Sequence, residues 1–212
     1  MSELTGDEPA RAAVLARIRA IAVVPAGPIP RDYLTSLGAD VDVVERFAER
    51  VADYRAIVHR ATAASLAATI AEALADRGAQ SLVVPAGVPS DWLSGLDPSV
   101  ERVTDDPPLT HAQLDAIDAV ITGCAIAVAE TGTIVLDAGS GQGRRALSLL
   151  PDRQVCVVRA DQIVGEIAEA LARLDPGRPL TWISGPSATS DIELDRVEGV
   201  HGPRNLDVVI VA

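Results

Sequence analysis

Apolar residues recur along the chain in short blocks, and the spacing within each block predicts alternating helices and strands. Amphipathic helices, with apolar positions three or four residues apart, are predicted at residues 8–21, 41–54, 63–77 and 161–174. Continuous apolar blocks typical of buried strands lie at residues 56–59, 81–84, 155–158, 180–183 and 206–211. A strand, a helix and a second strand in succession form a right-handed parallel crossover by default. The pattern therefore predicts an α/β fold, a single domain with a mostly parallel sheet flanked by helices.

The N-terminal part differs from the rest because a proline-rich segment, and no strand, separates its two predicted helices. Residues 25–34 read PAGPIPRDYL and contain three prolines. We therefore expect residues 1–54 to be an N-terminal helical arm packed on the main domain, and residues 55–212 to be the α/β domain. Arms of this kind often pack against a partner or a second subunit, so the pattern also allows for a homo-oligomer. Residues 85–108 are rich in Pro, Gly and Asp and predict a loop with one helical turn at residues 91–96.

The longest apolar stretch, Ala119–Asp137, is interrupted in its middle by the polar run Glu130-Thr131-Gly132-Thr133. The apolar flanks predict buried strands, so the polar run is expected at a strand end. Burying the Glu130 carboxylate would cost several kcal/mol unless hydroxyls, amides or a ligand met it. Two structures fit this pattern: a tight hairpin turn in which Gly132 adopts a positive φ, and a polar pocket at the edge of a buried sheet.

Charge composition excludes several classes of function. The chain has 212 residues, 18 basic against 30 acidic, and a formal net charge of −12 at pH 7. This balance opposes binding to nucleic acid. Every basic residue is Arg, so neither a lysine Schiff base nor a phosphate-loop lysine can form. No apolar window approaches the length of a membrane span and the first residues lack a signal-peptide core, so we expect a cytoplasmic protein.

The cysteines and histidines do not have the spacing of metal ligands. Cys124 and Cys156 both lie in apolar runs, where they are expected to fill the core, and the three histidines are scattered. We therefore expect no metal and no cofactor on this chain. Any iron–sulfur cluster used in electron transfer would have to belong to a partner protein.

A glycine-rich segment, Gly139–Gly143, follows a predicted strand and precedes Arg144 and Arg145. It lacks the third glycine of a dinucleotide-binding fingerprint, since Arg144 stands in that position. It is either a flexible loop or an anion-binding loop in which glycine amides, with Arg144 and Arg145 alongside, meet a phosphate or a carboxylate.

Two later segments also carry polar groups next to predicted strands. Residues 184–193, SGPSATSDIE, put small hydroxyl residues after a strand, which fits either helix capping or a ligand-binding crevice. Residues 199–204, GVHGPR, place His201 and Arg204 among glycines just before the last strand. A single histidine is more often structural than catalytic, but this surrounding permits close approach of an anion.

Several motifs, taken together and in this order, resemble the LUD domain family, of the lactate utilisation protein C (LutC/YkgG) type. The motifs lie between residues 119 and 212, and they are Ala129–Leu136, Ser148–Pro151, Ile183–Ser187, Asp191–Glu193 and Gly199–Arg204. The resemblance implies the fold of ribose-5-phosphate isomerase, glucosamine-phosphate isomerase and CoA transferases (NagB/RpiA/CoA-transferase-like). It also implies a role beside iron–sulfur proteins of a lactate utilisation operon in oxidising L-lactate to pyruvate.

These patterns lead to one set of candidate site residues. Six of them are expected to converge on one crevice at the carboxyl ends of parallel strands, namely Glu130, Thr131, Ser184, Ser187, His201 and Arg204. Glu130 and His201 are the catalytic candidates. The residues expected to bind a small carboxylate or phosphate ligand are Thr131, Gly132, Thr133, Arg144, Ser184, Gly185, Ser187, Thr189, Gly202 and Arg204. The alternative function is a free-standing isomerase or transferase acting on a phosphorylated sugar or an acyl-CoA, with Glu130 as base or nucleophile.

Overall fold

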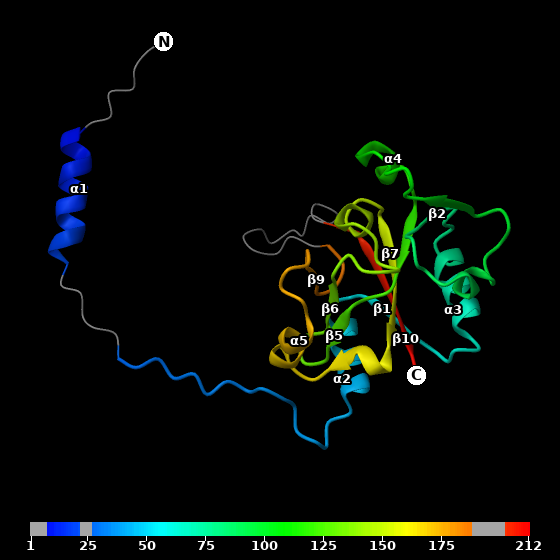
Figure 1. The fold of residues 1–212 in the computed structure, drawn as a ribbon, viewed down its shortest axis with the longest axis horizontal. Helices are drawn as coiled ribbons and strands as arrows, with labels where there is room; N and C mark the ends of the chain where they lie inside the picture. Colours follow the sequence, from blue (N-terminus) through cyan, green and yellow to red (C-terminus); the bar gives the residue numbers. More distant parts are fainter. Residues whose placement is uncertain (1–7, 22–26, 188–201) are drawn as a thin grey trace, which may run out of the picture. The chain divides into compact units, whose positions relative to one another are not determined.

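The computed structural model describes residues 8–21, 27–187 and 202–212 (Figure 1). The chain divides into two units, Met1–Tyr33 and Leu34–Ala212. The first contains helix α1, Glu8–Ala20. The expected boundary after residue 54 is not the one found, because the second predicted helix belongs to the larger unit. Packing of α1 on that unit stays a prediction.

Within the described residues, the larger unit is built around a six-stranded sheet in which every neighbouring pair of strands is parallel. The strands in spatial order are β1 Ile57–Ala61, β10 Asn205–Val211, β7 Arg153–Arg159, β4 Ala119–Thr122, β2 Ser81–Val84 and β3 Glu101–Thr104. The central strands are buried on both faces, which explains their uninterrupted apolar sequences. The structure confirms the predicted α/β class with a mostly parallel sheet flanked by helices.

A second, four-stranded sheet packs against one face of the first, and the sequence pattern did not separate the two. Its strands in spatial order are β8 Ile163–Val164, β5 Ile126–Val128, β6 Thr133–Leu136 and β9 Thr181–Ile183. The β5–β6 and β6–β9 pairs are antiparallel, and β5–β8 is parallel. Both sheets are made of similar apolar runs, so hydrophobic pattern alone could not assign a strand to one of them.

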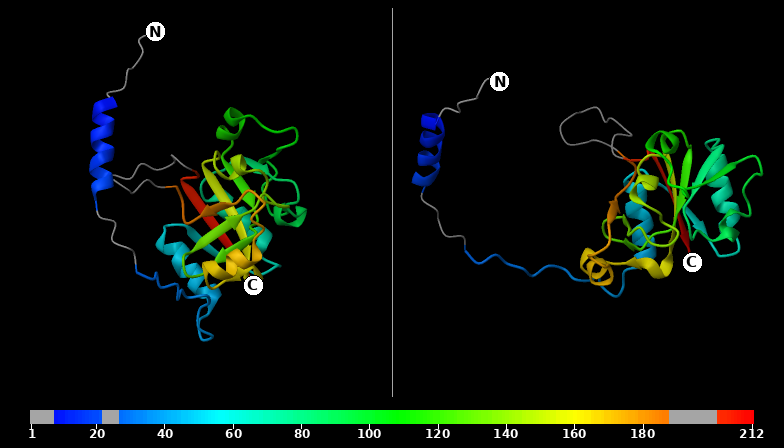
Figure 2. Two further views of the ribbon diagram at one scale, coloured as in Figure 1. Left: turned by 60° about the vertical axis from the view of Figure 1, so that its left-hand side comes forward. Right: turned by 45° about the horizontal axis from the view of Figure 1, so that its top comes forward.

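Helices cover the faces that the two sheets leave open (Figures 1 and 2). Helix α3, Leu66–Ala75, packs on the outer face of the six-stranded sheet through Leu66, Ile70 and Leu74. On the other face lie the second sheet and α2, Val43–Asp53, and the outside of the second sheet is covered by α5, Ile167–Arg173. The remaining helical segments of the larger unit are α4 His111–Asp115 and the 3-10 turns η1 Ser90–Leu93, η2 Arg145–Ser148 and η3 Ala160–Gln162.

Helix α2 illustrates how local sequence sets an element's position. The Asp42 side chain accepts hydrogen bonds from the backbone N–H groups of Val44 and Glu45, which caps the helix start. Phe47 and Ala48 lie four and three residues before Val51, so all three share one face of the helix, and this face is buried against the sheets. Burial of this face explains why α2 is part of the larger unit.

Candidate functional site

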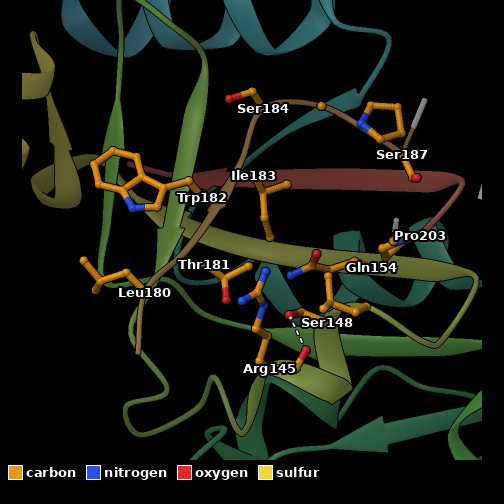
Figure 3. A pocket seen from close by; sticks show the side chains of 14 residues that line it. Arg145, Ser148, Gln154, Leu180, Thr181, Trp182, Ile183, Ser184, Ser187 and Pro203 are labelled. Atoms are coloured by element: carbon orange, nitrogen blue, oxygen red, sulfur yellow. Dashed lines mark hydrogen bonds between the residues drawn. The ribbon is translucent and has the colours of Figure 1, made fainter. Parts of the chain in front are cut away.

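A cavity of about 540 Å³ lies where β9 meets the amino-terminal ends of β7 and β10 (Figure 3). Its volume falls within the range of small-molecule binding sites, roughly 300–1,000 Å³. The described residues that line it come from four segments of the chain, and they are Arg145, Ser148 and Leu149, then Gln154, then residues 180–187, and finally Gly202 and Pro203.

The segment after β9 turns sharply to form one wall of the cavity. Gly185 has a φ of 86°, and a Cβ at this position would lie 2.7 Å from the Cβ of Tyr54. Only glycine accepts this combination of positive φ and close approach. Next to it, the Ser187 N–H donates to the Pro203 carbonyl at 2.8 Å, which ties the segment to the start of β10.

Two adjacent arginines at the start of η2 have different surroundings. Arg144 forms a bidentate ion pair with Asp105, at 2.7 and 2.9 Å, and also donates to the Leu109 carbonyl. The hydrogen bond from Arg144 lowers the pKa of Asp105, although burial opposes the shift. Arg145 instead lines the cavity, and its guanidinium has no partner within the part of the chain that the structure describes. In Figure 3 the Arg145 side chain extends toward Thr181 and Gln154.

Gln154 is a fully buried amide on the cavity wall. Its Nε2 donates to the Thr122 hydroxyl at 2.9 Å, but its Oε1 has no hydrogen-bond partner among the described residues. Leaving a buried polar atom unpaired costs about 1–3 kcal/mol. A buried amide oxygen that lacks a hydrogen-bond partner and belongs to a cavity-lining residue is typical of a site in which a ligand or a water molecule supplies the missing donor.

A chain of hydroxyl groups connects the cavity rim with the turn between β5 and β6. Thr131 Oγ1 lies 2.7 Å from Thr133 Oγ1, which in turn lies 2.8 Å from Ser184 Oγ. The pairing of β6 with β9 brings these residues together although they are far apart in the sequence. Of the residues predicted from the sequence, Ser184, Gly185, Ser187 and Gly202 line the cavity.

Glu130 does not line this cavity. Its carboxylate pairs with Arg50 at 3.3 Å and lies 4.0 Å from Arg46, so it holds the β5–β6 turn against α2. Gly132 has a φ of 59°, and a Cβ there would come within 2.8 Å of the Arg50 backbone. The hairpin-turn alternative for this stretch is therefore confirmed.

The remaining predicted residues lie elsewhere. Arg204 forms a bidentate ion pair with Asp152, at 2.5 and 2.9 Å, and it does not line the cavity. Thr189 and His201 lie outside the described residues.

The expectation that the crevice lies at the carboxyl ends of parallel strands was wrong for this cavity. Gln154 is the second residue of β7 and Pro203 precedes β10, so both come from amino-terminal ends in the parallel sheet. Ser184 does follow the carboxyl end of β9, but β9 belongs to the second sheet and runs antiparallel to β6. Sequence order alone could not give the direction in which β9 runs.

A second cavity, of about 530 Å³, contains part of the glycine-rich loop, namely Gly139 and its neighbours Ser140 and Gln142. Most of its charged groups are already paired with one another. Arg178 lies 3.2 Å from Asp137, and Arg159 lies 3.0 Å from Asp161. Because of this pairing, fewer polar groups lack a partner here than in the first cavity, which is lined by Gln154 and is hereafter named the Gln154 cavity.

The cysteines do not contribute a nucleophile. Both are buried, and the hydrogen bond with Cys156 together with burial raises the pKa of the Cys124 thiol well above its usual value. Within residues 8–21, 27–187 and 202–212, no group of three or more His, Cys, Asp or Glu side chains is arranged to hold a metal ion. None of the helices described there is long and apolar enough to cross a membrane.

Sequence reasoning missed Gln154 and Thr181. It considered Arg144 and Arg145 together for anion binding but kept only Arg144 among the candidate site residues, whereas the structure places Arg145 in the cavity. One signal for Gln154 was available, since it is an uncharged polar residue directly before the apolar run Val155–Val158. No signal distinguished the two arginines, because the η2 turn decides which one faces the cavity.

Comparison with known proteins agrees with the fold. A protein named lactate utilization protein C from Deinococcus radiodurans is 53% identical over 175 residues, which cover 80% of each chain. A protein of the same name from Bacillus subtilis is 32% identical over 130 residues, covering 58% of this chain and 54% of that protein. The crystal structure of a DUF162 family protein from Deinococcus radiodurans matches with a TM-score of 0.67 and 44% identity, over 81% of this chain and 97% of that one. The LUD domain model matches residues 44–211, and the chain therefore belongs to the LUD domain family.

Proposed function

We propose that this protein is a component of an L-lactate utilisation system and works in the cytoplasm beside iron–sulfur proteins that oxidise L-lactate to pyruvate. The observation that carries the proposal is the 53% identity to a lactate utilization protein C over 80% of both chains. Membership of the LUD domain family and a cavity of ligand size support it.

The composition of the chain supports the proposed division of work with partner proteins. Iron–sulfur clusters are generally held by four thiolates, and this chain has two cysteines, both in its core. Electron transfer through such a cluster therefore requires another protein. In this proposal the present chain binds the small acid, and its partners carry the redox groups.

The alternative, a free-standing isomerase or transferase with Glu130 as base or nucleophile, has less support. The Glu130 carboxylate is paired with Arg50 and Arg46, and Glu130 lines neither of the two cavities described above. A general base must reach the substrate, and the contacts of Glu130 direct it toward α2.

Reconstitution tests the proposal. Iron–sulfur proteins of a lactate utilisation operon would be purified and assayed with and without the chain, and L-lactate oxidation would be followed with an artificial electron acceptor. We expect pyruvate formation to require or to be strongly enhanced by the chain, and the chain alone to form none. Equal rates with and without it would contradict the proposed role, and turnover of a phosphorylated sugar or an acyl-CoA by the chain alone would favour the alternative.

A further inference from the structure

The Gln154 cavity is lined by two residues with polar groups that lack partners among the described residues, the Arg145 guanidinium and Oε1 of Gln154. A single class of small molecule can supply a partner to both groups. We propose that this cavity binds a small 2-hydroxy carboxylate, with the carboxylate on the Arg145 guanidinium and the hydroxyl group donating to Oε1 of Gln154. This inference rests on the proposed function and assigns its ligand site.

Arg145 supplies the charge for the carboxylate. It lines the cavity and has no partner among the described residues, while its neighbour Arg144 is fully engaged with Asp105. A guanidinium binds a carboxylate through two parallel N–H···O bonds. Because the whole protein has a net charge of −12, its overall field opposes anion binding, so a local unpaired cation is needed.

Gln154 supplies the group that distinguishes a hydroxy acid from other acids. With Nε2 committed to Thr122, the free Oε1 can only accept a hydrogen bond. A 2-hydroxy acid offers a hydroxyl donor beside its carboxylate, whereas a simple carboxylate or a 2-oxo acid offers none. An unmet buried acceptor rejects a ligand that lacks the matching donor.

The same amide also indicates how the product could be accommodated. The Thr122 hydroxyl can donate as well as accept, so a rotated Gln154 amide could place its Nε2 donor toward the cavity instead. A 2-oxo acid would then find a donor for its carbonyl, at the cost of rotating the buried amide. The observed hydrogen bond, with Nε2 of Gln154 donating to the Thr122 hydroxyl, favours the hydroxy acid.

The walls around these groups set only a loose upper limit on the size of the ligand. Leu149 and Ile183 add apolar surface to the lining. In Figure 3 the Thr181 and Ile183 side chains point toward Gln154 and Arg145. The cavity has room for an acid larger than three carbons, or for a three-carbon acid with water. Its chemistry selects the carboxylate and the hydroxyl, and it leaves the length of the carbon chain loosely restricted.

A binding experiment on the full-length protein tests this assignment without any partner. Calorimetric titration would compare L-lactate, pyruvate and propionate, which share a three-carbon skeleton and a carboxylate and differ at the second carbon. We expect L-lactate to bind at least fivefold more tightly than either of the others. This comparison uses the wild-type protein and so does not depend on the folding of a variant.

Three variants then locate the site. Arg145→Ala should weaken binding of all three acids at least tenfold. Gln154→Leu should remove the preference for L-lactate over propionate. Arg173→Ala, the control, removes the same charge from an exposed arginine of the second cavity and should leave binding unchanged.

Three results would overturn the inference: no saturable binding of L-lactate, equal affinity for L-lactate and propionate in the wild-type protein, or equal losses in Arg145→Ala and Arg173→Ala. These failures are distinct from failure of the proposed function, which is decided by lactate oxidation with the partner proteins. A chain that supports oxidation but binds no acid would keep its role and lose this site.

Discussion

The two faces of β7 at its amino-terminal end differ in how completely their polar groups are paired. On the α3 side, Arg153 donates to Asp207 at 2.9 Å, and His59 lies 2.9 Å from the other oxygen of the same carboxylate. On the opposite side, Gln154 keeps an unpaired amide oxygen next to a cavity. Neighbouring residues of one strand therefore have different tasks. The paired face stabilises the fold, and the unpaired face is available for a ligand.

The same contrast recurs between Arg144 and Arg145. The first is held by Asp105 and by the Leu109 carbonyl, and the second faces the cavity. A polar group that has all its hydrogen-bond partners contributes to the stability of the fold. A buried polar group that lacks a partner lowers this stability, and a bound ligand can supply the missing hydrogen bond. Four predictions test this division, beginning with the group whose loss should matter most.

Replacing Asp207 by Asn should destabilise the protein by about 3–5 kcal/mol, because the buried Arg153 would lose its counter-charge. Urea denaturation followed by circular dichroism would measure the loss. A change below about 1 kcal/mol would mean that the Arg153–Asp207 pair is not structural.

The contribution of Asp207 should also depend on pH. Burial favours its neutral form, but hydrogen bonds from His59 and Arg153 outweigh this and lower the pKa of the Asp207 carboxyl in the folded protein. Its stabilising effect should be complete above the unfolded-state value, about 3.9, and should be lost as pH falls through the lower folded-state pKa. Denaturation of wild type and Asp207→Asn at several pH values should therefore show their difference shrinking in acid. A difference that grew in acid would contradict this sign.

Arg144→Ala should lower the free energy of unfolding by about 1.5–3 kcal/mol, since it removes charge-assisted hydrogen bonds to the largely buried Asp105. The same denaturation measurement applies. If L-lactate affinity fell tenfold while stability stayed unchanged, the roles of the two arginines would be reversed.

Arg145→Ala is the matched comparison and should change stability by less than about 0.5 kcal/mol, because the side chain has no partner to lose within the described part of the chain. Its effect should instead appear in ligand-induced stabilisation. A stability loss as large as that of Arg144→Ala would show that Arg145 makes structural contacts.

Much of the fold was predictable, because buried strands and amphipathic helices carry strong local patterns. The run Val155–Val158 and the α2 residues Phe47 and Val51 were placed correctly for this reason. Strand β3 was missed since it lies at the sheet edge and its sequence, Glu101–Thr104, has no apolar run. The division into two sheets was also missed, because it depends on which strands pair and not on their individual sequences.

The site was predictable only in part. Ser184 and Gly185 were found because polar and glycine residues after an apolar strand indicate a turn near a crevice. Gln154 was missed because its interest as a site residue lies in the missing hydrogen-bond partner of its Oε1, which only the three-dimensional contacts reveal. Glu130 was overvalued, since the sequence did not indicate that Arg46 and Arg50 of α2 would meet its charge.

The most direct measurement is a crystal structure of the full-length protein grown with saturating L-lactate. We expect lactate in the Gln154 cavity, with its carboxylate about 2.7–2.9 Å from the Arg145 guanidinium and its hydroxyl oxygen within about 3 Å of Gln154. Lactate bound elsewhere, such as beside Arg173 and Arg178 in the second cavity, or a cavity that holds only water, would contradict it.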